Sequence, residues 1–81
     1  MIADKLKIGD IFKDIEGDYC KVYDVGSGKV WINYDKNLNN LKKSNYRDST
    51  YYDKSHLYEM EVDGNLTLIE SKINWRKRLE K

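Results

Sequence analysis

The fold of this chain is decided by residues 18–35, which read DYCKVYDVGSGKVWINYD. Two runs rich in β-branched and aromatic residues flank the Gly-Ser-Gly segment at 26–28, a pattern typical of a β-hairpin. Side chains alternate between the two faces of a strand, so Val30 and Ile32 share one face and Trp31 lies on the other. We therefore predict a hairpin with Val30 and Ile32 in the core.

The first strand of this hairpin, residues 19–25, does not alternate cleanly. Cys20 and Val22 share one face, whereas Tyr23 and Val25 share the other. Either a β-bulge or partial burial of both faces explains such a pattern. Free cysteines are often buried as small apolar groups, so Cys20 is predicted to be a core residue.

The other segments can be added to this hairpin to give one domain over residues 1–81. In chain order we predict a strand meander at 6–34 with a strand at 11–15, a long polar loop at 35–55, a hairpin at 56–70 and a short helix at 71–81. Strict alternation directs Tyr58, Met60 and Val62 inward. The Asp-Gly-Asn sequence at 63–65 is a signal for the turn of the second hairpin.

The predicted loop at 35–55 is rich in Asn, Ser, Lys, Tyr and Asp. Long loops of this composition in compact domains are often functional. Leu38 and Leu41 are the only aliphatic residues in it, and their spacing allows one helical turn.

Charged residues make up 36% of the chain, whereas the net charge is only +1, so their distribution is more informative than their sum. Two basic segments, 26–47 and 71–81, alternate with two acidic segments, 1–25 and 48–70. The segment 48–70 carries six acidic groups and one basic group. This alternation favours solvated faces that neutralise one another over a single strongly charged surface.

The sequence predicts a cytoplasmic protein without a membrane partner. Cys20 is the only cysteine, which excludes an internal disulfide and fits a reducing compartment. No apolar run approaches the roughly 20 residues that a membrane-spanning helix needs. The N-terminal residues do not follow the pattern of a secretory signal peptide.

Four segments, taken in order, resemble the small Src-homology-3-like barrels found in many short bacteriophage and mobile-element proteins: LKIGDIF at 6–12, YCKVYDV at 19–25, GKVWI at 28–32 and YEMEVDGNLTLI at 58–69. No specific named family is indicated. The resemblance implies a mainly β fold, a single antiparallel barrel of about five strands with a short C-terminal helix. It also implies a binding module, because such barrels bind nucleic acid, peptides or proteins through loops and one open face.

Catalytic and metal-binding motifs are not evident in the sequence. His56 and Cys20 are the only His and Cys, and their separation fits no zinc site. The Gly-Ser-Gly segment lacks the spacing of a phosphate-binding loop. We therefore expect no catalytic residue, no metal site and no cofactor, and we predict that the protein is not an enzyme.

Protein recognition is the first functional hypothesis. Trp, Tyr and Arg are the usual anchors of protein interfaces, and the predicted contact residues are Trp31, Tyr46, Arg47, Tyr51 and Tyr52. Trp31 is either presented outside the sheet or covered by the C-terminal helix. The resemblance suggests an accessory protein of a phage or mobile element that binds or inhibits a host or defence protein.

Nucleic-acid binding is the alternative hypothesis, because cations interleaved with aromatic rings bind phosphates and bases. The residues predicted for this role are Lys42, Lys43, Arg47, Arg76, Lys77 and Arg78. The low net charge and the acidic segment 48–70 count against it. A third hypothesis is that the same Lys and Arg residues sequester a small anionic ligand, in a monomer or across a homodimer.

Overall fold

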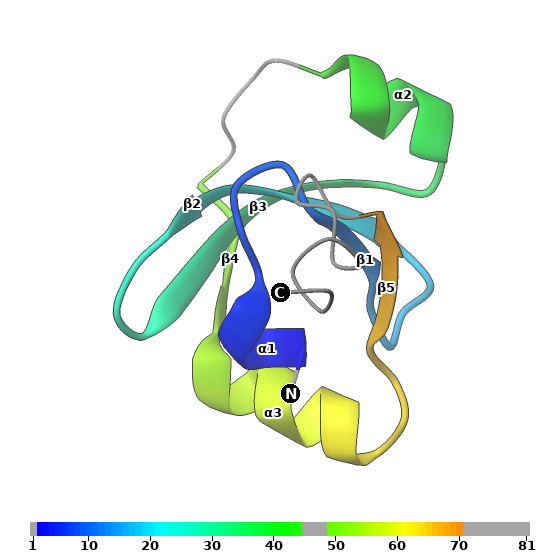
Figure 1. Cartoon of the computed structure of the whole chain (residues 1–81). Coiled ribbons are helices and arrows are strands. Elements are labelled where there is room, and N and C mark those ends of the chain that lie inside the picture. Colours follow the sequence, from blue (N-terminus) through cyan, green and yellow to red (C-terminus); the bar gives the residue numbers. More distant parts are fainter. Residues whose placement is uncertain (1, 45–48, 71–81) are drawn as a thin grey trace, which may run out of the picture.

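The computed structural model describes residues 2–44 and 49–70. Within these ranges, five antiparallel strands form one curved sheet in the order β4-β3-β2-β1-β5, and short helices pack around it (Figure 1). In chain order the elements are α1 Ile2–Lys5, β1 Ile11–Lys13, β2 Tyr19–Val25, β3 Lys29–Asp35, α2 Leu38–Lys43, β4 Tyr51–Asp53, α3 Lys54–Val62 and β5 Thr67–Glu70. The prediction of a mainly β fold is confirmed.

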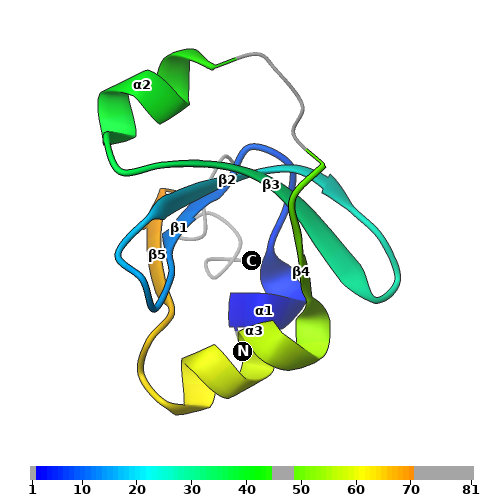
Figure 2. The ribbon, with the colours of Figure 1, turned by 180° about the vertical axis from the view of Figure 1, so that it is seen from behind.

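The sheet forms an arch whose two sides are its edge strands, β4 and β5 (Figures 1 and 2). It is not closed into a barrel, so the predicted closure is wrong. The physical reason is α3, whose nine residues connect the two edge strands below the arch. A helix of this length measures about 13 Å, which keeps β4 and β5 too far apart to pair.

The β2–β3 hairpin has the predicted position and turn. Val22 pairs with Ile32 and Val25 pairs with Val30, while the backbone N–H of Gly26 donates to the carbonyl of Lys29 at 2.8 Å. The register of the pairing between β2 and β3 shifts between Val22 and Asp24, which confirms the predicted irregularity in the first strand.

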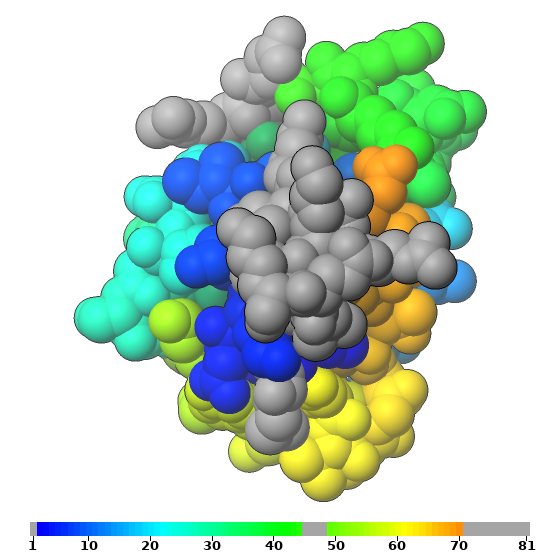
Figure 3. All heavy atoms as spheres, viewed as in Figure 1, coloured from blue at the N-terminus to red at the C-terminus, as the bar shows by residue number. Residues whose placement is uncertain are grey.

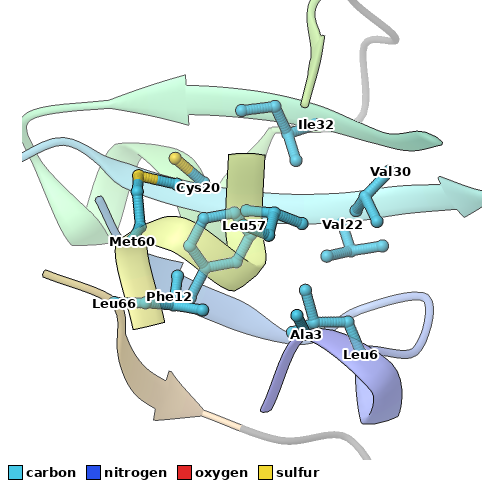
Figure 4. Packing of buried hydrophobic residues seen from close by; sticks show 10 residues of the cluster. All are labelled: Ala3, Leu6, Phe12, Cys20, Val22, Val30, Ile32, Leu57, Met60 and Leu66. Atoms are coloured by element: carbon cyan, nitrogen blue, oxygen red, sulfur yellow. The ribbon is translucent and has the colours of Figure 1, made fainter. Parts of the chain in front are cut away.

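The core fills the space between the arch and the helices α1 and α3. Phe12 of β1 is completely buried, as are Cys20 and Val30, and Ile32 is nearly so. Figure 4 shows side chains from α1, the first three strands, α3 and the segment before β5 pointing toward one another. The buried cluster consists of Ala3, Leu6, Phe12, Cys20, Val22, Val30, Ile32, Leu57, Met60 and Leu66. The core positions predicted for the hairpin are therefore confirmed.

The predicted hairpin at 56–70 is wrong, because its first half is the helix α3. Gly64, with φ of 78°, ends this helix: its N–H donates to the carbonyl of Glu61, and the N–H of Asn65 donates to that of Met60. This pair of bonds is a Schellman motif, which needs the same left-handed glycine as a hairpin turn. The helical twist buries Met60 but exposes Val62, which had been expected to point inward.

The predicted loop at 35–55 also contains regular structure, namely α2 and β4. The helical turn expected around Leu38 and Leu41 is confirmed, and α2 lies on the outer side of the arch with Leu41 completely buried (Figure 2). The side chain of Asn37 caps this helix by accepting from the N–H of Asn40 at 3.1 Å. The predicted helix at 71–81 lies outside the described residues.

We expect Gly64→Ala to destabilise the protein by about 1–2 kcal/mol, because an L-residue in the left-handed region is strained. Gly28→Ala is the matched control, since Gly28 has no positive φ and a Cβ there would meet no atom within 4 Å. Urea unfolding curves of the two variants measure the difference. Equal free energies of unfolding would contradict the helix end described above.

Candidate functional site

An exposed group of aromatic and cationic side chains lies where β3 pairs with β4. Trp31 and Tyr51 are directly opposite each other in the antiparallel ladder, and their ring centroids are 5.0 Å apart. The ammonium group of Lys29 lies 4.4 Å from the centroid of the Tyr51 ring. Such ring pairs and cation–π contacts each contribute about 0.5–1.5 kcal/mol, so the three side chains hold one another in place. We call Lys29, Trp31 and Tyr51 the aromatic patch.

The aromatic patch is accessible from outside. Tyr51 is 43% exposed and Trp31 is partly exposed. Beside Trp31 is an open hollow of about 420 Å³, lined also by residues 26–29 and Asp53. Because two of these residues are glycines without side chains, the turn leaves the hollow uncovered. The patch therefore offers two rings and one positive charge to a partner.

The structure brings together only some of the residues predicted for protein recognition. Trp31 and Tyr51 form the patch, whereas Tyr52 is turned to the opposite face of β4. The Tyr52 ring lies 6.2 Å from that of Phe12, and its hydroxyl donates to Oδ2 of Asp14 at 2.7 Å. These contacts argue against Tyr52 as a contact residue. Tyr46 and Arg47 lie outside the described residues.

The carboxylate of Asp14, which is buried, organises the turn after β1. Its Oδ1 accepts from the N–H groups of Glu16 and Asp18, both at 3.0 Å, and its Oδ2 accepts from the thiol of Cys20 as well as from Tyr52. This turn ends β1 at Lys13, so the strand predicted at 11–15 is too long. The contact with Tyr52 could not be predicted from local patterns, because it joins residues that are far apart in the chain.

Burial raises the pKa of the Cys20 thiol, and the neighbouring Asp14 carboxylate raises it further. The same two causes, in the same order, raise the pKa of the Tyr52 hydroxyl. The reactive form of a cysteine is the thiolate, which this environment disfavours. Cys20 is therefore a structural residue, and it does not have the properties of a catalytic nucleophile.

Three carboxylates, those of Asp14, Glu16 and Asp18, come within 4.8 Å of one another beside a hollow of about 180 Å³. Carboxylate oxygens are ligands for hard cations, and the spacing of His and Cys residues does not reveal a group of this kind. Asp14 already accepts four hydrogen bonds, however, and Asp18 pairs with Lys36 at 3.2 Å. These contacts give the group a structural role in the turn after β1.

Lysines predicted for nucleic-acid binding lie at the C-terminal end of α2, away from the aromatic patch. Lys42 pairs with Glu70 of β5 at 2.9 Å, and Lys43 is exposed. Lys21 donates to the carbonyl groups of Lys42 and Ser44, at 3.4 and 3.3 Å, and so holds the helix end to β2. Arg47, Arg76, Lys77 and Arg78 lie outside the described residues.

The chain matches no protein family, no curated protein and no solved structure. Among residues 2–44 and 49–70, no helix is long and apolar enough to cross a membrane.

We expect Tyr52→Phe to destabilise the protein by about 1.5 kcal/mol, the lower end of the range for hydrogen bonds to charged groups, because this bond is only partly buried. Tyr51→Phe is the matched control on the other face of β4 and should change stability little. Chemical denaturation at neutral pH measures both variants. A similar loss in the two would show that the bond to Asp14 contributes nothing.

The pKa values of Cys20 and Tyr52 are raised in the folded state, so the free energy of unfolding decreases at alkaline pH. In the unfolded chain the pKa values of the two groups are 9.0 for Cys20 and 10.0 for Tyr52. Below these values both groups are neutral in the folded and in the unfolded state, so the full free energy of unfolding is retained. As the pH rises past these values, only the unfolded chain ionises, so stability is lost. We expect Cys20→Ala combined with Tyr52→Phe to unfold with a shallower dependence on pH between 8 and about 11. An unchanged slope would contradict this account.

Proposed function

We propose that this protein is a non-enzymatic protein-interaction module whose contact surface is centred on the aromatic patch. The observation that carries the proposal is the Trp31–Tyr51 pair, which is assembled on paired strands and left accessible beside an open hollow. Trp and Tyr are enriched among the residues that contribute most to protein interfaces.

Preorganisation also supports this role. The two rings already touch each other, and Lys29 covers part of Tyr51. A partner would therefore find side chains that lose little conformational entropy on binding.

The strand order supports the view that the fold is an open variant of a Src-homology-3-like barrel. β1 pairs with both β2 and β5, which brings the last strand beside the first. With the sequence resemblance, this extends the proposal to a cytoplasmic accessory protein of a phage or mobile element. Its partner would be a host or defence protein that it binds or inhibits.

The test is affinity purification of the tagged full chain from its native host. We expect a stoichiometric partner, and we expect Trp31→Ala with Tyr51→Ala to reduce its affinity about tenfold or more. Tyr34→Ala is the matched control, since Tyr34 is 47% exposed but lies outside the patch. Circular dichroism should show that all variants keep the wild-type fold.

Two results would contradict the proposal. One is equal capture of the partner by the double variant and by the wild type. The other is binding to random oligonucleotides with a steep dependence on salt, which would favour the nucleic-acid alternative. We expect no such dependence, because the net charge is only +1 and the segment 48–70 is acidic.

A further inference from the structure

The C-terminal end of α3 carries a second accessible surface. Val62 is 75% exposed, the largest exposed fraction among the large hydrophobic residues that the structure describes. It lines a hollow of about 290 Å³ together with Tyr58, Glu59 and Asp63. In Figure 3 the atoms of α3 form the lower edge of the molecule, next to those of α1. We call these four residues the α3 surface.

The charges at the C-terminal end of α3 have the sign that is unfavourable for a helix. Glu59, Glu61 and the C-cap residue Asp63 are acidic, and the last turn contains no basic residue. A helix C-terminus carries partial negative charge, so carboxylates there are unfavourable. Glu59 and Asp63 are also four residues apart, a spacing at which like charges destabilise a helix.

One of the three carboxylates has a clear structural role. Glu61 accepts from the backbone N–H groups of Ile2 at 2.7 Å and Ala3 at 3.1 Å, which fastens α1 to α3. The nearby Asp4 similarly accepts from the hydroxyl of Tyr58. That hydrogen bond is the main cause of the raised pKa of Tyr58.

Glu59 and Asp63 have no such role within the described part of the chain. Both are exposed, and neither carboxylate forms an ion pair or a hydrogen bond with a residue in 2–44 or 49–70. They therefore lower the stability of α3 without compensation there. Residues that violate local preferences in this way are expected at functional sites.

We propose that the α3 surface is a docking site for a basic segment of a partner protein. A lysine or arginine of the partner would lie between Glu59 and Asp63, and an adjacent apolar side chain would pack on Val62 and the Tyr58 ring. The positive charge would remove the repulsion that the free helix carries.

This surface is separate from the aromatic patch, which lies at the other end of the segment formed by β4 and α3. The α3 surface would bind a positively charged partner. The aromatic patch presents the positive charge of Lys29 and would therefore favour a partner of the opposite charge. The two surfaces can therefore be tested independently.

The probe is a synthetic peptide in which four lysines flank one leucine, titrated into the isotope-labelled full chain and followed by amide NMR shifts. We expect the largest shifts at residues 58–63. Glu59→Gln with Asp63→Asn should weaken binding about fivefold. The same variant should melt about 2–4 °C higher, because the repulsion between the two carboxylates is removed.

Apolar recognition is tested with a second peptide in which glycine replaces the leucine. Val62→Ser should weaken binding of the leucine peptide and leave the glycine peptide unchanged. Ile15→Ser is the matched control, since Ile15 is 58% exposed and lies in the other acidic turn, between Asp14 and Glu16. It should change neither affinity.

Three results would overturn the proposal. The first is a set of shifts centred on residues 14–18, which would show binding to any acidic surface. The second is unchanged affinity in the Glu59→Gln, Asp63→Asn variant. The third is a lower melting temperature for that variant, which would show that the two carboxylates stabilise the fold.

Discussion

The packing of α3 beneath the arched sheet is the interaction on which the rest of the structure depends. Leu57 and Met60 are buried in one cluster with Phe12, so burial of apolar surface holds the helix between the two edge strands. This position explains why the sheet stays open and why β4 has a fixed place beside β3. The register of β4 in turn sets Tyr51 opposite Trp31. The aromatic patch is thus a consequence of how the helix is packed.

Local signals in the sequence were sufficient for the β2–β3 hairpin and insufficient for α3. In the second strand of the hairpin the apolar residues alternate, and the glycine-rich turn before it agrees with this pattern; neither feature suits a helix. Around Met60, apolar residues at every second position imitate a strand, while the helical pair Leu57 and Met60 is too short a pattern to compete with it. Gly64 adds to the ambiguity, because a left-handed glycine ends helices and turns hairpins alike.

The candidate sites show a similar division. Trp31 could be placed on the face opposite Val30 and Ile32 from its own strand alone, but its contact with Tyr51 depends on a pairing between distant segments. Tyr51 and Tyr52 are neighbours of the same type and were predicted to act together. Strand geometry sends them to opposite faces, one to the patch and one to Asp14. The α3 surface could not be recognised before the helix itself was known.

Cys20 gives this small protein an internal reporter of its own motion. It is the only thiol in the chain, it is completely buried, and it donates to the carboxylate that organises the first turn. An alkylating reagent can reach it only when β2 separates from that turn. The rate of alkylation under native conditions therefore measures the free energy of that opening, and a ligand bound at either surface should slow the reaction only if its binding is coupled to the core.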